Sequence, residues 1–525
     1  MMQKTTTGLE KNAWQARDRV LPKILAESPL LWLGLALLVG VHYALILWGP
    51  FGISGDEAQY WLWSRHLAWG YYTKSPLIAG ILALSTLLAG NSLLAVRLFA
   101  PIFALALAGV AYLFAREVHG EPAPARLAAL WMACIPVYFL GGLVMTTDVP
   151  MLLLWLLALW AFWRAIVCEQ RWAWLLAGTA VGLGLQAKYN LGVLPAAVLV
   201  TLLGHGSGRR QLRTPWPWLG VVVALLILAP NLRWNSQHGW ATVLATWGNV
   251  TGGQGGWSSW WSFLGGQIGV LGVLPFFLLA VLLWRERRSW PAGRSAVLVW
   301  ISLITWVFYA LKSLSGQVDA NWPIAAYLGL IIWAAGPLSR APWRQWALAS
   351  LAVCTLLIAT VLALPQLHAL GVPLPSKWYV PFKQTRGWRE LAAAAQDRLE
   401  RAQPAFVVTN FYQYSATLAF YLPTHPFVYY QSFSSEPSKC SIHGNQYLLW
   451  PGYEGRLGEN ALLVLDGENA AIPSSWIRQF RRCGRPENFS ATSAGVTWHR
   501  VTLLLCRDFL GPQSRSGPGS GGRFH

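Results

Sequence analysis

Two adjacent carboxylates, Asp56 and Glu57, open the part of the sequence in which residue types and spacing could do chemistry. They follow directly on an apolar stretch at 31–49, so we expect them where that stretch leaves a bilayer, a depth at which ionisable groups are costly and usually functional. Aromatic residues and Lys74 come next; a carboxylate can accept a proton from a hydroxyl group, and an ammonium can hold a phosphate. Segment 54–76 therefore suits a ligand with a charged head and an apolar tail. For any single Trp or Tyr there, an aromatic belt at the membrane surface is the alternative.

Two more ionisable residues, Asp148 and Lys188, are expected at the same membrane face. Asp148 lies between apolar runs at 125–144 and 149–166, and Lys188 interrupts the apolar run 172–204. Convergence of lysines and carboxylates from distant parts of the chain predicts a site for a phosphate or diphosphate. The alternative is that Asp148 and Lys188 are loop residues or a mutual ion pair.

The composition is that of a polytopic membrane protein. Of 525 residues, 55% are hydrophobic, 12% are charged and 33 are Trp, which is far more apolar than a soluble domain. The formal net charge of +19 comes from basic residues that lie mostly in short connectors between apolar runs, as in cytoplasmic loops. The sequence has no Gly-rich phosphate loop, which argues against ATP or a nucleotide sugar as substrate.

The alternation of basic and Arg-poor connectors predicts the topology. Residues 1–30 are polar and basic, which places them in the cytoplasm, and the first apolar run has no cleavage site and is expected to stay as an anchor. The run 77–90 is short for a crossing of ~20 residues and is expected to be an interfacial helix. Segment 232–262 is expected to be a long outer loop that contains His238. Hydropathy gives about eleven crossings, an odd number that puts the region after residue 370 outside.

From about residue 370 the sequence changes to that of a soluble domain. Residues 386–402 are predicted to form an amphipathic helix. Strands are predicted at four short apolar runs, 405–410, 427–430, 461–466 and 501–506. We therefore expect a small extracytoplasmic α/β domain at 370–510, followed by a disordered Gly, Pro and Ser-rich tail at 511–525.

Six cysteines divide between the two regions. A packing role is expected for the three in or beside apolar runs, Cys134, Cys168 and Cys354. In the outer domain an oxidising compartment would allow two of Cys440, Cys483 and Cys506 to pair. We expect Cys440 with Cys483, because Cys506 sits in a strand-like apolar run. No Cys or His spacing typical of a zinc site is present.

Several stretches resemble a known family: GDEAQYWLWS with GYYTKSPLIAG, MTTDVPMLLLW, LQAKYN and GQVDANWP. They look like those of the glycosyltransferase family 39 and 83 group, membrane transferases of the GT-C fold. This group is similar to the bacterial aminoarabinose and galacturonosyl transferases of lipid A and lipopolysaccharide core, and more distantly to protein O-mannosyltransferases. The resemblance covers roughly residues 30–340, and the carboxyl-terminal domain matches only in position and general character. Where the family more usually has Pro-Pro after the lysine, this chain has Ser75-Pro76.

The resemblance implies transfer of a sugar from a polyprenyl-phosphate carrier to an acceptor, with inversion at the anomeric carbon. By motif match, Asp56 is the catalytic carboxylate, and Lys74 and Lys188 contact the donor phosphate. Asp148 orients those lysines, and Glu57 has a structural role. The pocket is expected to include Tyr60, Tyr72, Tyr189 and His238.

The residue chemistry agrees with that assignment. Polyprenyl phosphate is already a good leaving group, so charge stabilisation by lysines suffices and no acid is required. No cofactor is expected; the chemistry does not demand a metal, and a divalent ion near the acidic pair is compatible with it. The expected partners are a polyprenyl-phosphate-linked sugar, a glycolipid, lipopolysaccharide or protein acceptor, and the lipid bilayer, with no nucleic acid. The expected location is the bacterial inner membrane, with the active site and the carboxyl-terminal domain in the periplasm.

We therefore expect a GT-C-type polytopic α-helical membrane protein. Residues 1–30 are the cytoplasmic segment, 31–366 the transmembrane catalytic domain with its first outer loop at 50–91, and 370–510 the outer domain. The competing function is a transporter or flippase of a lipid-linked or polar solute, which predicts polar residues at mid-span and often inverted repeats. Here the spans are apolar in their middles and the ionisable groups gather at one face, which favours the enzyme. A structural scaffold of an envelope assembly is a third interpretation that no feature supports specifically.

Overall fold

The computed structural model describes residues 26–204, 206–253, 255–288, 293, 295–369, 372, 380–403, 405–432, 445–493 and 495–512. These residues form two compact units. The first comprises the described residues up to Gly49, with Ala68–Gly70 and Lys74–Ala363. The second comprises Pro50–Leu67, Tyr71–Thr73 and the described residues from Leu364. The segment expected as the first outer loop, 50–91, is therefore shared between the two units.

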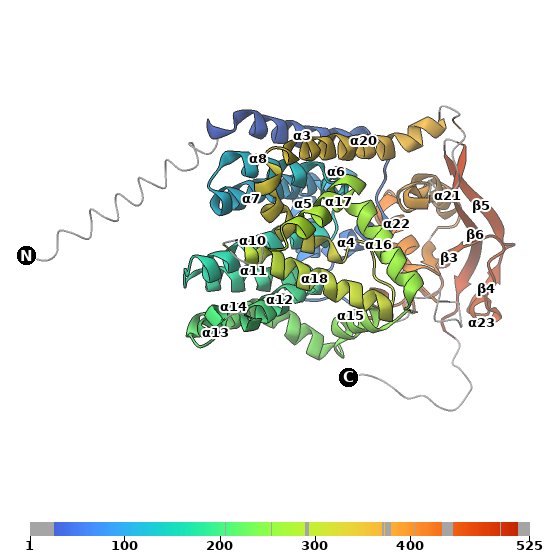
Figure 1. The fold of residues 1–525 in the computed structure, drawn as a ribbon. Helices are drawn as coiled ribbons and strands as arrows, with labels where there is room; N and C mark the ends of the chain where they lie inside the picture. Colours follow the sequence, from blue (N-terminus) through green and yellow to red (C-terminus); the bar gives the residue numbers. More distant parts are fainter. Residues whose placement is uncertain are drawn as a thin grey trace, which may run out of the picture. The chain divides into compact units, whose positions relative to one another are not determined.

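The first unit is helical (Figure 1). In chain order its elements are α3 (Pro29–Trp48), α5 (Leu77–Ala89), α6 (Leu93–Arg97), α7 (Ala100–His119), α8 (Pro122–Cys134), α9 (Pro136–Gly141), α10 (Asp148–Val167), α11 (Ala173–Ala187), η1 (Tyr189–Gly192), α12 (Val193–Gly204), α13 (Gly206–Leu212), α14 (Pro215–Gln237), α15 (Ala241–Thr251), α16 (Trp257–Leu271), α17 (Val273–Arg285), α18 (Ala296–Ser315), η2 (Pro323–Ala325), α19 (Ala326–Leu338) and α20 (Trp343–Ala369).

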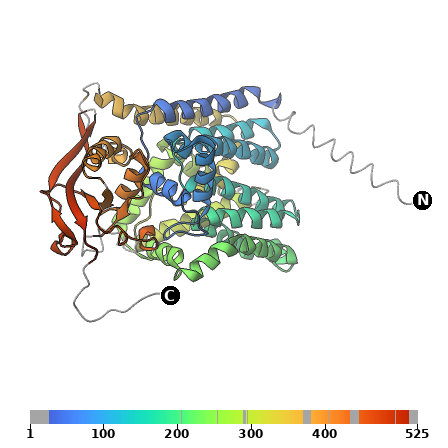
Figure 2. The same cartoon turned by 180° about the vertical axis from the view of Figure 1, so that it is seen from behind.

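Neighbouring helices of this unit form a row in the order α3, α7, α10, α11 and α14, each packed against the next (Figure 1). The α11–α14 contact depends on small residues, since a Cβ added at Gly178 would lie 2.1 Å from the carbonyl oxygen of Gly220. Helix α20 runs along α3, where Ile358 and Ile46 share an apolar cluster (Figure 2). Helix α19 is buried over almost its whole length and packs against α7, α8 and α18.

Six of the described helices are long and apolar enough to span a bilayer: α3, α6 with α7, α10, α14, α18 and α20. The pair α16 and α17 would make a seventh span, bent by 107°. The bend lies at Gly272, whose φ of 90° is a conformation that glycine adopts readily. The predicted count of eleven crossings is not confirmed, because the remaining apolar helices are shorter.

Two other expectations about this unit are wrong. The run 125–144 is not one helix: Ile135 has an extended backbone before Pro136, which ends α8 and starts α9. Segment 232–262 is not a long loop, because α14 continues to Gln237 and both α15 and the start of α16 lie within it. The helix expected at 77–90 is present as α5.

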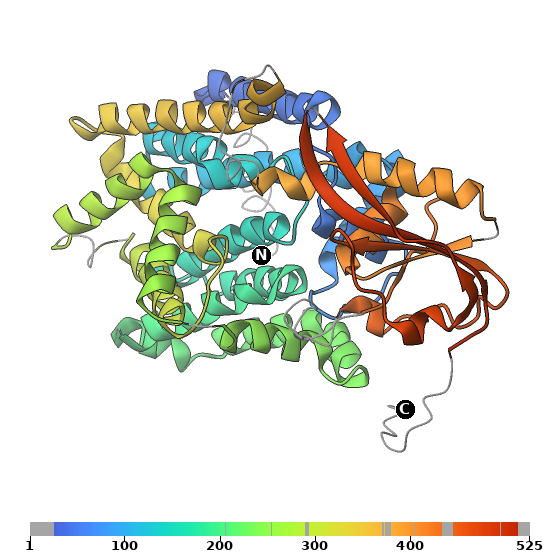
Figure 3. The ribbon, with the colours of Figure 1, turned by 90° about the vertical axis from the view of Figure 1, so that its right-hand side faces the viewer.

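The second unit is an α/β structure, as expected, and its strands appear in red and orange in Figure 3. Its strands are β1 (Ala405–Thr409), β2 (Tyr429–Tyr430), β3 (Asn460–Asp466), β4 (Phe480–Cys483), β5 (Glu487–Ser493) and β6 (Val496–Phe509). They form a sheet in the order β2-β1-β3-β6-β4, with β5 also paired to β6. The β1 pairings with β2 and β3 are parallel, and all pairings of β6 are antiparallel.

The helices of this unit are α4 (Gly55–Ser64), η4 (Val380–Thr385), α21 (Trp388–Glu400), α22 (Tyr412–Tyr421), η5 (Gln446–Leu448) and α23 (Ser474–Ile477). The predicted helix at 386–402 is confirmed as α21, and the four predicted strands as β1, β2, β3 and β6. The strands β4 and β5 and the helix α22 were not predicted. The tail expected at 511–525 lies, apart from its first two residues, outside the described residues.

The expected pairing of Cys440 with Cys483 is wrong, since Cys483 is bonded to Cys506. Antiparallel pairing of β4 with β6 places these two residues directly opposite each other. The apolar strand around Cys506 thus favours the bond, because its neighbour β4 carries the second cysteine. Cys440 itself lies outside the described residues.

Candidate functional site

The carboxylate Asp56 lies in the first turn of α4, in the second unit. The helix begins with a capping box: the Ser54 hydroxyl accepts from the Glu57 amide at 3.2 Å, and the Glu57 carboxylate accepts from the Ser54 amide at 3.0 Å. Glu57 is therefore fully buried and committed to the cap, whereas Asp56 is exposed. Of the two acidic residues, only Asp56 presents its carboxylate to solvent.

Helix α22 holds one oxygen of Asp56. The Gln413 side-chain amide donates to Asp56 Oδ1 at 3.0 Å, while Oδ2 accepts no hydrogen bond from the described residues. Gly55 allows this approach, because a Cβ there would lie 2.8 Å from the Gln413 Cβ. Burial, together with the charge of Asp56, raises the pKa of the neighbouring Tyr412 to about 12. Asp56 thus has a fixed orientation and one oxygen able to take up a proton.

In the first unit, Lys188 and Asp148 form an ion pair between helix ends. Lys188 has an extended backbone directly after α11, and its Nζ donates to Asp148 Oδ1 at 2.7 Å. Asn321, just before η2, donates to Asp148 Oδ2 at 2.9 Å. The Lys188 and Asp148 side chains are only 10% and 14% exposed. The mutual ion pair considered from the sequence is therefore present, and Asn321 completes it.

A second polar network surrounds Tyr189. Its hydroxyl donates to the side-chain oxygen of Asn231 and accepts from Asn235 Nδ2 at 3.2 Å. Asn231 also donates to the carbonyl oxygen of Trp69 at 2.7 Å. Both asparagines are fully buried and lie one turn apart on α14, so both side chains lie on the same face of the helix. Because their polar groups have hydrogen-bonding partners there, the helix can continue through this polar part of the sequence.

The other expected pocket residues are more scattered. Tyr60 is 3% exposed and packs on Trp63 within the second unit. The backbone amide of Tyr72 donates to Gln446 Oε1 at 2.7 Å, and burial raises the pKa of the Tyr72 phenol. His238 directly follows α14, and its Nδ1 lies 2.8 Å from the Trp234 carbonyl oxygen.

Lys74 is half-buried in the first unit, shortly before α5. Its joint action with Lys188 on one phosphate stays a prediction, as do the roles of the other site residues. Sequence reasoning missed Asn231, Asn235, Asn321 and Gln413. Of these, only Asn321 lies in a stretch that carried the family resemblance.

Within the part of the chain that the structure describes, no three His, Cys, Asp or Glu side chains gather where they could hold a metal ion. The described groups are an exposed carboxylate, a shielded lysine and their hydrogen-bonding partners. Such groups can move a proton and neutralise a phosphate.

Comparison with solved structures decides the fold. ArnT from Cupriavidus metallidurans, bound to undecaprenyl phosphate, superposes with a TM-score of 0.61 over 94% of this chain and 100% of that chain, at 18% identity. The chain has the GT-C fold. The apo state of the same ArnT gives a TM-score of 0.60 over 91% of this chain.

Sequence relatives of this GT-C chain are envelope transferases. Residues 73–234 match the family model described as dolichyl-phosphate-mannose-protein mannosyltransferase. A lipid A galacturonosyltransferase, RgtD, from Rhizobium johnstonii is 31% identical over 292 residues, which is 53% of this chain and 59% of the relative. The lipopolysaccharide core galacturonosyltransferase RgtB of the same organism is 30% identical over 38% of this chain and 40% of its own length. The chain thus spans about three fifths or less of the curated relatives it matches.

The GT-C fold and the six helices of spanning length make this a multi-pass membrane protein. Its bacterial relatives indicate the inner membrane. This agrees with the inner-membrane location expected from the sequence, while the periplasmic placement of the active site and of the carboxyl-terminal domain stays a prediction.

Proposed function

We propose that this chain is a membrane glycosyltransferase that moves a sugar from a polyprenyl-phosphate carrier to a lipid or lipopolysaccharide acceptor at the periplasmic face. Similarity to two galacturonosyltransferases supports the class of reaction and of acceptor. The fold shared with ArnT bound to undecaprenyl phosphate supports the class of donor. The orientation rests on the positive-inside bias of the connectors.

In the proposed reaction, an acceptor hydroxyl attacks the anomeric carbon of the donor sugar. Asp56 takes the hydroxyl proton as the new carbon–oxygen bond forms. The bond between the anomeric carbon and the phosphate oxygen breaks, and polyprenyl phosphate leaves with the electron pair, giving inversion. Lys74 and Lys188 neutralise the charge that grows on the leaving phosphate.

The observation that carries the proposal is the contact of Lys188 with Asp148, whose second oxygen accepts a hydrogen bond from Asn321. Asn321 holds Asp148, and Asp148 holds the ammonium of Lys188, whose side chain is only 10% exposed. The ammonium is therefore already desolvated and oriented for an anion. A lysine held in this way contributes more to phosphate binding than a mobile surface lysine would.

The test is transfer by the purified full chain in proteoliposomes. The donors are polyprenyl phosphates that carry galacturonic acid, aminoarabinose or mannose, and the acceptors are lipid A and core lipopolysaccharide, with mass spectrometry as readout. A new glycosidic product that disappears in Asp56→Asn is the expected result. Movement of the donor across the bilayer without a product would instead identify a flippase.

Orientation is tested separately by cysteine labelling from outside the cell. On a background that lacks the native free cysteines, Glu400→Cys in α21 is expected to react with an impermeant maleimide and Arg209→Cys in α13 is expected to be protected. The reverse pattern would place the proposed site on the cytoplasmic side.

A further inference from the structure

The second unit contains an open cavity of about 390 Å³ beside the sheet. It lies where α21 meets the chain around β4, the start of β5 and the end of β6. Its lining includes five arginines and a single carboxylate residue, Glu487. The arginines are Arg398, Arg401, Arg482, Arg485 and Arg507.

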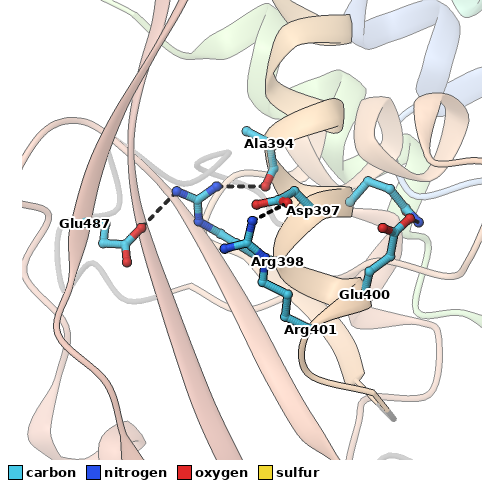
Figure 4. A network of polar contacts seen from close by, with 7 residues as sticks. Ala394, Asp397, Arg398, Glu400, Arg401 and Glu487 are labelled. Carbon is cyan, nitrogen blue, oxygen red and sulfur yellow. Dashed lines mark hydrogen bonds and ion pairs between the residues drawn. The ribbon is translucent and has the colours of Figure 1, made fainter.

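Two of the arginines come from α21 and have carboxylate partners. Arg398 donates to Glu487 Oε2 at 2.8 Å and to the Ala394 carbonyl oxygen at 2.9 Å, so it bridges the helix and strand β5 (Figure 4). Arg401 donates to Asp397 at 2.6 Å, one turn back on the same helix (Figure 4). These contacts fix where the two guanidinium groups lie.

The other three arginines make no ion pair with any carboxylate of the described residues. Arg482 of β4 and Arg507 of β6 are direct cross-strand partners, so their side chains leave the same face of the sheet. Like charges in that position destabilise a strand pair. The adjacent disulfide between Cys483 and Cys506 holds β4 to β6 and keeps the two arginines together. A repulsive pair maintained by a covalent link indicates that an anion belongs between them.

The volume and the apolar lining of the cavity indicate which kind of anion it could bind. Its volume falls in the ~300–1,000 Å³ range of small-molecule sites and is much larger than one phosphate needs. Leu462, Leu503 and Leu505 supply apolar lining, which suits the C–H face of a sugar ring. Arginines on two sides offer planar forks for two separate phosphate groups.

We propose that this cavity binds a saccharide that carries two phosphate groups, one held by Arg398 and Arg401 and the other by Arg482, Arg485 and Arg507. The inference does not rest on the proposed transferase activity, because it concerns binding to the second unit alone. Binding and transfer can therefore succeed or fail separately.

The experiment is calorimetric titration of the full chain in detergent with glucose 1,6-bisphosphate. Arg482→Gln and Arg507→Gln are each expected to raise the Kd about tenfold to a hundredfold, the loss of one charge-assisted contact. The matched control is Arg500→Gln, because Arg500 is exposed on the same strand β6 but lies outside the cavity and pairs with Glu468. Its Kd is expected to stay at the wild-type value.

Stability in the absence of ligand gives a second readout. Because Arg482 and Arg507 repel each other, either substitution is expected to raise the unfolding temperature of the ligand-free protein while it weakens binding. A lower unfolding temperature together with weaker binding would assign these arginines to the fold and overturn the proposal.

Three further results would also overturn it: no binding of glucose 1,6-bisphosphate, an equal loss of affinity in Arg500→Gln, or inorganic phosphate binding as tightly as the bisphosphate.

A measurement in nanodiscs distinguishes a soluble sugar bisphosphate from a lipid headgroup as the ligand. Replacing part of the phosphatidylcholine by phosphatidylglycerol is expected to leave the Kd of the bisphosphate unchanged. Competition by phosphatidylglycerol that depends on Arg482 would assign the cavity to the membrane surface.

Discussion

The ion pair of Lys188 and Asp148 could stabilise the fold, or its lysine could contact the donor phosphate. Removing the two charges, one at a time and then together, distinguishes these roles. Both side chains are nearly buried and 2.7 Å apart, so loss of one partner leaves the other charge without its counter-ion. Breaking a buried pair costs about 3–5 kcal/mol. In Lys188→Met the carboxylate keeps its hydrogen bond from Asn321, which puts the expected loss of stability at the lower end, ~3 kcal/mol. Asp148→Asn is expected to cost less, because an amide oxygen still accepts from the ammonium.

The double variant, Lys188→Met with Asp148→Asn, contains no unpaired charge. Its stability is expected to return to within ~1 kcal/mol of the wild type, since replacing both partners of a buried pair is often neutral. Transfer should not return, because the ammonium proposed to meet the phosphate is absent. Loss of a contact of ~1.5–3 kcal/mol slows transfer by about one to two orders of magnitude.

The measurements are thermal unfolding by Trp fluorescence and the rate of transfer from a polyprenyl-phosphate sugar, on the same detergent-purified samples. Arg164 and Glu117 serve as a matched control, because this 2.6 Å pair lies in the last turn of α10, ~24 Å along the helix from Asp148. In the double variant Arg164→Met with Glu117→Gln, the rate of transfer is expected to fall only if the stability falls, and to be normal if the stability is normal. If the Lys188 and Asp148 double variant regained both stability and transfer, Lys188 would serve only Asp148 and the proposed donor contact would be refuted.

Four further outcomes are expected. Asp56→Asn should abolish turnover while donor binding persists, as measured by titration with a polyprenyl-phosphate sugar; a wild-type rate would assign the base elsewhere. Lys74→Ala and Lys188→Ala should each weaken donor engagement by about one to two orders of magnitude, and the double variant should fall little below the worse single; additive losses would mean separate roles. Burial lowers the pKa of His499 to about 4. As the pH falls, its imidazole is therefore protonated in the unfolded chain before it is protonated in the folded protein. The second unit should therefore lose stability, up to ~3 kcal/mol, as pH falls from about 6.5 to 4, and His499→Gln should flatten that profile in pH-dependent unfolding. Cys483→Ser with Cys506→Ser should destabilise this unit by about 3 kcal/mol, as expected for a closed loop of 23 residues; an unchanged unfolding temperature would contradict this.

Local patterns in the sequence sufficed to predict several elements. The break between α11 and α12 was predicted because Lys188 and Asn190 interrupt an apolar run, and β1 and β3 because short apolar runs are bounded by turn residues. The capping box at the start of α4 likewise lies within four consecutive residues, Ser54 to Glu57. In each case the signal lies within a few residues of the element it specifies.

Features that depend on distant partners were not predicted. Strand β5, with the sequence ENFSATS, is polar and is stabilised by its pairing with β6. The polar end of α14 stays helical because Asn231 and Asn235 find partners on Tyr189 and Trp69. Gln413 could not be assigned to Asp56, since 357 positions separate them. The disulfide was missed for the same reason, because its geometry follows from β4, which no local pattern indicated.

The docking of α4 on α22 limits how freely this protein can be rearranged. The two helices meet at a glycine, with the side chain of Gln413 lying where any larger residue at position 55 would have to go. A chimera that keeps the helical bundle but takes its carboxyl-terminal region from a relative would bring a foreign α22 against Gly55 and Asp56. Such an exchange is expected to work only when residues 50–67 travel with the new region. Residues 50–67 and the carboxyl-terminal region should therefore diverge together in evolution, as linked segments of one unit rather than as independent modules.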